Sequence, residues 1–113
     1  MKSRTRNTKN KGIMEFLVYK EGDGYVAVCL TFDIVEEGSD PVALMASIKE
    51  AAELHLETVI NQNLSEKLLN RYAPEEYWQK YFDVLHAIEN HSGPVSAFPV
   101  VSPYSSAIMA RVG

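Results

Sequence analysis

The junction between a predicted strand and a predicted helix at residues 36–44 constrains the fold more than any other feature of the chain. The sequence EEGSDPVAL passes from two glutamates through Gly38 and Ser39 to Asp40 and Pro41. Asp40 suits a helix N-cap, and Pro41 suits the first helical position, because a backbone N–H there has no helical partner to lose. Proline also disfavours helical geometry at the residue before it, as a cap requires. The junction therefore predicts a helix that begins at Pro41.

The residues after Pro41 carry the apolar periodicity of an amphipathic helix near residues 41–61. Apolar positions recur at three- and four-residue steps, and most charged side chains fall on the other face. The predicted buried stripe contains Met45, Ile48, Ala52, His55 and Val59, flanked by Leu44, Ala51, Leu56 and Ile60. We expect this helix to lie across a sheet formed by the strands that precede it.

Three strand patterns precede the helix. The segments IMEFLVYK (residues 13–20) and YVAVCL (residues 25–30) are rich in β-branched and aromatic residues, and EGDG between them has the residue types of a hairpin turn. Both sets of alternate residues in YVAVCL are largely apolar, which is typical of a central strand covered on both faces. FDIVEEG (residues 32–38) is a shorter third strand. The pattern predicts a three-stranded antiparallel meander.

A second helix is predicted near residues 74–90, where Pro74 and two glutamates suit the positive end of the helix dipole. A short helix or turn is expected in residues 61–73. A last strand around residues 97–101 contains Pro99, so it belongs at an edge of the sheet. These elements define an α+β fold, with a β-β-β-α core, an additional C-terminal helix and room for a fourth strand at an edge.

Length and charge predict one domain with a basic N-terminal arm. The 113 residues suit a single domain, which we place at residues 13–101, followed by a tail at residues 102–113. Residues 1–12 carry five basic side chains, no acidic one and no apolar residue after Met1, so we expect a disordered arm. The other 101 residues carry six basic and fifteen acidic side chains, a formal net charge of −9. An acidic body repels nucleic acid and favours basic partners.

Cysteine content and hydropathy bear on the compartment. Cys29 is the only cysteine, which excludes an intramolecular disulfide and favours a reducing compartment. No apolar run approaches the roughly 20 residues that span a bilayer, and residues 1–12 lack the apolar stretch of a signal peptide. We therefore expect a cytoplasmic protein that does not contact a membrane.

The titratable residues do not form a catalytic or metal-binding pattern. The acidic residues of the predicted turns, strand ends and helix cap are Asp23, Asp33, Glu36, Glu37 and Asp40. None of them sits in mid-strand facing a neighbour, as a two-metal cluster requires. His86 and His91 are five residues apart, not at the four-residue spacing that puts two ligands on one helical face. We expect no catalytic residue, no metal and no cofactor.

An aromatic group on the second predicted helix is the best local indication of binding. It consists of Tyr77, Trp78, Tyr81 and Phe82. The two adjacent pairs span more than one helical face, so packing on the sheet accounts for only part of the group. Rings that remain at the surface are typical anchors of protein interfaces. The core and interface interpretations both remain open for this group.

Residues 23–57, DGYVAVCLTFDIVEEGSDPVALMASIKEAAELHLE, carry a resemblance to a known family. Gly24, Tyr25 and Ala27 match a glycine-tyrosine-x-alanine element in a second strand, and Gly38 and Ser39 match a glycine and polar residue that end a third. The helix then continues with an IKEAIEL-like pattern, formed here by Ile48, Lys49, Glu50, Ala51, Glu53 and Leu54. In these features the chain resembles the HicB antitoxin family of bacterial toxin–antitoxin systems.

The resemblance implies a partly degenerate ribonuclease-H-like fold without nuclease activity. HicB-like domains bind and block a small basic HicA-type toxin that cleaves RNA, and the acidic body agrees with such a partner. Family members often carry a C-terminal DNA-binding element. Residues 64–91 hold only Lys67, Arg71 and Lys80 as basic side chains, so DNA binding is not expected here.

The sequence therefore predicts a non-enzymatic, self-associating protein-binding module, and an antitoxin is the leading hypothesis. The predicted contact residues are Asp33, Glu36, Glu37, Tyr77, Trp78 and Tyr81. One alternative is a HicB-like regulatory or scaffold domain without a toxin. The other is a small metal-dependent nuclease that retains ribonuclease-H chemistry.

Overall fold

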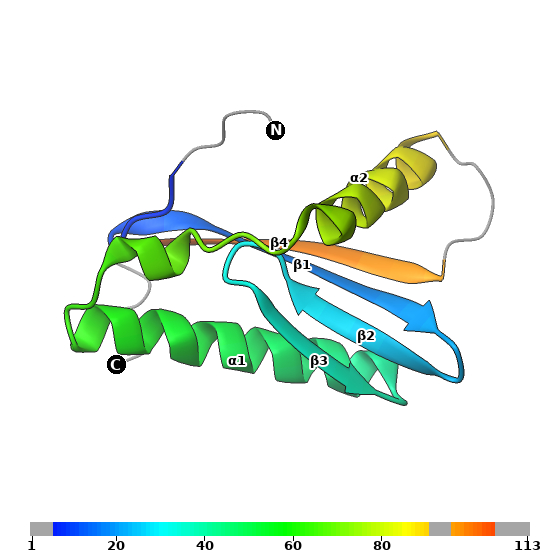
Figure 1. Cartoon of the computed structure of the whole chain (residues 1–113), viewed down its shortest axis with the longest axis horizontal. Helices are drawn as coiled ribbons and strands as arrows, with labels where there is room; N and C mark the ends of the chain where they lie inside the picture. The colour runs from blue at the N-terminus through cyan, green and yellow to red at the C-terminus, as the bar shows by residue number, and fades with distance from the viewer. Residues whose placement is uncertain (1–5, 91–95, 106–113) are drawn as a thin grey trace.

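A computed structural model describes residues 6–90 and 96–105 of the chain (Figure 1). Its elements in chain order are β1 (Lys11–Glu21), β2 (Gly24–Cys29), β3 (Ile34–Gly38), α1 (Pro41–Asn61), the 3₁₀-helix η1 (Glu66–Leu69), α2 (Glu75–Glu89) and β4 (Ala97–Ser105). The strands and both long helices lie where the sequence predicts them. The fold is α+β, with two α-helices and a four-stranded antiparallel sheet.

The sheet has the strand order β3-β2-β1-β4. β1 and β2 form a hairpin that closes at the pair Glu21–Gly24, and Gly22 in its turn has a φ of 61°, in the left-handed region that suits glycine. β4 pairs with β1 from Lys11 to Tyr19, so the last strand lies beside the first (Figure 1). The meander is therefore confirmed, and β4 is an edge strand as Pro99 predicts.

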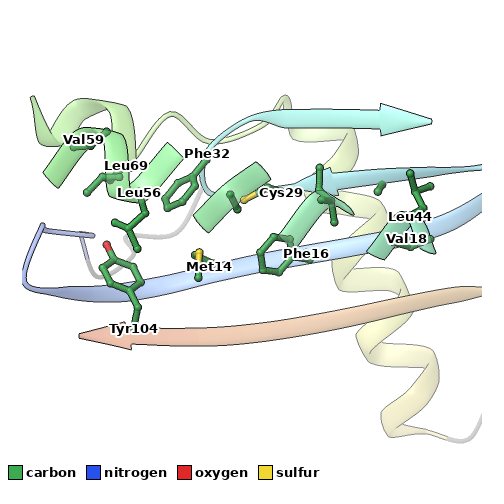
Figure 2. Close-up of a cluster of buried hydrophobic side chains, with 13 residues drawn as sticks. Met14, Phe16, Val18, Cys29, Phe32, Leu44, Leu56, Val59, Leu69 and Tyr104 are labelled. Carbon is green, nitrogen blue, oxygen red and sulfur yellow. The ribbon is translucent and has the colours of Figure 1, made fainter. Parts of the chain in front are cut away.

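The two α-helices cover opposite faces of the sheet. α1 buries Leu44, Ile48, Ala52, Leu56 and Val59. These side chains pack with Phe16 and Cys29 from the strands (Figure 2). α2 contributes Trp78 and Tyr81 to a second core on the other face, with Leu17 and Val28. β2 is thus covered on both faces, as its sequence predicts. Each fully buried large apolar side chain in these two cores contributes about 1.5–3 kcal/mol to folding.

The junction before α1 has the predicted geometry. Asp40 is the N-cap, with φ −112° and ψ 111°, and Pro41 is the first helical residue. The Asp40 carboxylate accepts hydrogen bonds from the backbone N–H groups of Val42, at 3.0 Å, and Ala43, at 3.3 Å. Two of the N–H groups that a helix leaves without internal partners are therefore satisfied, which sets where α1 begins.

The N-terminal segment differs from the predicted disordered arm over residues 6–12. β1 begins at Lys11, and Asn7 is 4% exposed. The Asn7 side chain accepts a hydrogen bond from the Ile13 N–H at 2.9 Å, and its Nδ2 donates to the carbonyl oxygens of Ile13 and Leu69. The backbone of Asn7 exchanges two further bonds with the Asn70 side-chain amide. A polar side chain thus anchors a segment that has no apolar residue to bury.

The predicted tail at residues 102–113 also begins too early. Ser102, Pro103, Tyr104 and Ser105 belong to β4. Tyr104 is 5% exposed, and its hydroxyl donates a 2.7 Å hydrogen bond to the Thr8 carbonyl. A Cβ at Gly12, the partner of Tyr104 across the ladder, would overlap Asn7 Oδ1 and the Tyr104 hydroxyl. The rest of the predicted tail, residues 106–113, lies outside the described residues, as do residues 1–5 of the arm.

Candidate protein-binding surface

The hydrogen bonds of β1 show which backbone groups of each strand point toward which neighbour. The Glu15 carbonyl accepts from Leu30 N at 2.8 Å, beyond the end of β2, and the Lys20 N–H donates to Ser96 O at 3.1 Å, before the start of β4. Backbone groups of successive strand residues point to opposite sides. The odd-numbered residues of β1 therefore bond toward β2, and the even-numbered residues bond toward β4.

The outer edge of β4 carries two prolines at outward-pointing positions. Pro99 is opposite Leu17 and Pro103 is opposite Ile13, and both of these β1 residues direct their backbone groups toward β2. The backbone groups of Pro99 and Pro103 therefore point away from the sheet, where proline removes no ladder bond. Because neither proline has an N–H, β4 would offer an added strand no donor at the two outward positions on either side of Val101. Prolines of this kind blunt an edge against further pairing.

The outer edge of β3 has no such protection. Val28 pairs with Leu17 and bonds toward β1, so Ala27 bonds toward β3, where its partner is Glu36. The backbone groups of Val35 and Glu37 therefore point outward. Within residues 6–90 and 96–105, no hydrogen bond to these outward groups is present. β3 thus presents an outer edge on which no outward position is occupied by proline.

An acidic groove lies beside this edge, where the β1–β2 hairpin meets the end of β3. It has a volume of about 500 Å³ and is lined by Glu21, Asp23, Gly24, Tyr25, Val26, Glu37, Gly38 and Ser39. Three of the lining side chains are carboxylates and none is basic. A Cβ at Gly24 would lie 3.0 Å from the Gly38 carbonyl oxygen, so this glycine permits the close approach of β2 and β3. Lys20 places a cation near the groove, because its amino group lies 5.3 Å from the Tyr25 ring centroid.

The charges of several acidic side chains act on Tyr19, on the face of the sheet covered by α2. Burial is the main cause that raises the pKa of Tyr19 to about 12, and the negative charges of Glu21, Glu76 and Glu37 add to it, as does Tyr77. Three carboxylates on three different elements, Glu21 of β1, Glu76 of α2 and Glu37 of β3, therefore influence the phenol of Tyr19. The Lys80 amino group lies 4.8 Å from the Tyr19 ring centroid, within the range of a cation–π contact.

The structure separates the predicted acidic contact residues. Asp33 is exposed in the turn before β3, with a φ of 58° that Asp tolerates better than most residues. Glu36 is half-buried on the α1 face, where its Oε1 accepts a 2.7 Å hydrogen bond from the Ser47 hydroxyl. Glu37 is exposed on the opposite face and lines the acidic groove. Of the three, only Glu37 lies with the other groove carboxylates.

The aromatic contact residues are divided between core and surface. Trp78 is 0% exposed and Tyr81 is 1% exposed, so the structure places both predicted contact residues in the core. The rings are 5.9 Å apart in an edge-to-face arrangement within the second core. Tyr77 of α2 is half-buried, and Phe82 is 43% exposed. α2 buries Trp78 and Tyr81, which are one turn apart and face the sheet. The sequence leaves open which of the four aromatic residues face the sheet.

Sequence reasoning missed most of the acidic groove. The sequence pattern assigns Glu21 and Asp23 to the hairpin turn alone. The strand register also brings this turn beside the end of β3, through the pairs Glu21–Gly24 and Tyr25–Gly38. The acidic composition of EGDG and EEG was the available signal, because a hairpin followed by a third strand places these two ends side by side.

A second concave surface lies between α1 and β4. It has a volume of about 400 Å³ and is lined by Pro41, Val42, Met45, Ala46, Lys49, Phe98 and Val100. Val42 is 79% exposed and Phe98 is 48% exposed, so this groove is apolar where the first is acidic. It contains none of the predicted contact residues.

Among residues 6–90 and 96–105, no group of three His, Cys, Asp or Glu side chains is placed to hold a metal ion. The Cys29 thiol is buried, and burial raises its pKa. No helix within the described ranges is both long and apolar enough to cross a membrane.

Comparisons of the chain with protein-family models, with curated proteins and with solved structures found no match.

Proposed function

We propose that this protein is a non-enzymatic protein-binding module, an antitoxin of HicB type that binds and inhibits a small basic HicA-type toxin. The acidic groove carries this proposal, since Glu21, Asp23 and Glu37 line one concave surface that has no basic lining residue. Charge complementarity at such a surface steers association and selects a basic partner. The groove is also adjacent to the outer edge of β3, whose outward backbone groups make no hydrogen bond within residues 6–90 and 96–105, so it offers hydrogen bonding as well as charge.

The position of the HicB-like residues supports the proposal. Gly24, Tyr25, Gly38 and Ser39, which carry part of the resemblance, all line the acidic groove. Gly24 lets β2 and β3 approach closely, and Gly38 leaves room for the Leu44 side chain of α1. Tyr25 supplies an apolar surface of the kind that anchors protein interfaces. These four HicB-like residues thus lie at the acidic groove, and its negative charge suits the basic toxin that the resemblance implies.

The test is a binding measurement with any small basic protein that is encoded next to this chain. We expect a complex by isothermal titration calorimetry, and relief of growth arrest when the two proteins are coexpressed. The double variant Glu21→Lys/Glu37→Lys should weaken binding at least tenfold, about 1.4 kcal/mol, and should reduce its salt dependence. The matched control Glu50→Lys/Glu53→Lys makes the same charge change on the exposed side of α1 and should have little effect.

Two results would contradict the proposal. If the neighbouring protein forms no complex and coexpression gives no relief, the antitoxin function is lost, and a regulatory or scaffold domain without a toxin becomes the better description. If the groove and control variants weaken binding equally, net charge rather than the groove determines the affinity.

A further inference from the structure

We infer that the partner binds by strand addition, with an extended basic segment pairing along the open edge of β3 as a fifth strand of the sheet. This inference rests on the proposed function, because it assigns a binding geometry to the same basic partner. The occupant is a segment of another protein, rich in Lys or Arg and able to adopt a β conformation. Strand addition of this kind gains affinity from main-chain hydrogen bonds and specificity from alternate side chains.

The backbone of β3 supplies the hydrogen bonds. Val35 and Glu37 each direct one N–H and one C=O away from β2, which gives two donors and two acceptors along a five-residue strand. Both residues are exposed, and Val35 is 43% exposed. The outward positions on β3 carry no proline, in contrast to Pro99 and Pro103 on β4. The two edges of the sheet therefore differ in the property that permits pairing.

The side chains of β3 indicate the composition of the added segment. Glu36 projects to the α1 face, where Ser47 holds its carboxylate, and Glu37 projects to the α2 face beside the acidic groove. A basic residue opposite either glutamate forms a favourable cross-strand pair. Val35 offers an apolar neighbour on the same face as Glu37. An alternating basic and apolar segment thus matches the edge on both faces.

A second copy of the chain matches this edge poorly. Two-fold antiparallel pairing of β3 that uses all four outward groups of each strand would place Glu36 opposite Glu36 of the other copy. Like charges directly opposite across a strand pair are destabilising, and the neighbouring Glu37 side chains would add to the repulsion. The prolines of β4 disfavour pairing at the other edge. The charge of β3 therefore selects a basic partner over self-association.

The probe is an acetylated and amidated heptapeptide of alternating lysine and valine, added to the full-length protein and followed by NMR. We expect the amides of Val35 and Glu37 to shift and to exchange more slowly with solvent at saturating peptide. A peptide of the same sequence with every residue N-methylated keeps its charge but has no residue N–H left to donate along either edge, and it should bind at least about fivefold more weakly. This peptide control leaves the protein unchanged.

The protein variant Val35→Pro removes one outward N–H in the same way that Pro99 does on β4. It should weaken peptide binding about fivefold or more relative to Val35→Ala, with both variants checked for folding by thermal unfolding. The inference is overturned if the peptide fails to bind, if the N-methylated peptide binds equally well, or if the shifts lie away from β3. Protection of the two amides without peptide, with a doubled mass, would identify a second copy as the occupant and would also overturn it.

The toxin measurement distinguishes this inference from the proposed function. If Glu21→Lys/Glu37→Lys weakens the complex with the basic neighbour but Val35→Pro binds it as well as Val35→Ala, the protein binds its partner by charge without strand addition. If neither the native protein nor Val35→Ala forms a complex with the basic neighbour, the proposed function itself fails.

Discussion

Asn7 is the residue whose removal best tests the described N-terminal segment. Its side chain makes three hydrogen bonds: Ile13 N to Oδ1 at 2.9 Å, Nδ2 to Ile13 O at 3.1 Å and Nδ2 to Leu69 O at 3.0 Å. The backbone N–H and C=O of Ile13 point to the β2 side of β1, but β2 does not extend far enough to pair with them. The Asn7 side-chain amide bonds these two groups instead. Asn7→Ala removes all three bonds and leaves the groups on Ile13 and Leu69 without their partners.

The expected loss is large for a single polar side chain. At about 1 kcal/mol for each net hydrogen bond, three bonds give about 3 kcal/mol, and the desolvated groups left behind set a range of about 2–4 kcal/mol. A domain of this size has a total free energy of unfolding of about 6–15 kcal/mol. Urea unfolding followed by circular dichroism should therefore show a lower midpoint with an unchanged slope, and Tm should fall by roughly 10 °C.

Two further variants make the Asn7 result specific. Asn10→Ala changes an exposed residue three positions along and should alter stability by less than about 0.5 kcal/mol. Asn7→Asp keeps the size of the side chain but replaces its donor with an acceptor that faces two carbonyl oxygens, so it should be at least as destabilising as Asn7→Ala. A loss below about 1 kcal/mol in Asn7→Ala would refute the reasoning and restore the disordered arm that composition predicts.

Three other predictions follow from the core, the phenol and the prolines. Trp78→Ala should cost about 3–5 kcal/mol of stability with no change in oligomer mass, whereas Phe82→Ala should cost far less; a change of mass in folded Trp78→Ala would restore its interface role. Because the folded-state pKa of Tyr19 is raised to about 12, its hydroxyl contributes stability that is fully present below the ordinary pKa of 10 and is lost as pH rises toward 12. Alkaline unfolding of the native chain against Tyr19→Phe should show that loss, and a Tyr19 that ionises near 10 by ultraviolet titration would contradict it. Pro99→Ala/Pro103→Ala restores two outward donors on β4 and should raise self-association in sedimentation experiments, and an unchanged mass at high concentration would show that the prolines do not blunt this edge.

The fold was predictable where one local signal agreed with one tertiary role. Asp40 and Pro41 set the start of α1 through backbone chemistry that needs no distant partner. The doubly apolar pattern of YVAVCL predicts a central strand because only two covering layers can bury both of its faces. Pro99 predicts an edge because a central strand cannot spare its N–H.

The remaining features depend on contacts between residues far apart in the chain. Asn7 is 63 residues from Asn70, and nothing in the polar sequence around either residue reveals their paired hydrogen bonds. The aromatic group on α2 could be assigned to core or surface only once the helix was placed on the sheet, which buries Trp78 and Tyr81 and leaves Phe82 outside. The acidic groove needs the strand register to bring Glu21 and Asp23 beside Glu37.

The pairing of β1 with β4 has a consequence for synthesis of the chain. β1 contributes nine residues to the β4 ladder, but it is made first and β4 is the last of the described strands to leave the ribosome. The meander and α1 are complete long before that, so one side of β1 remains an unprotected edge during translation. β4 then closes that edge and presents Pro99 and Pro103 in its place. The strand synthesised last thus converts a nascent chain that can pair with its neighbours on a polysome into one that resists doing so.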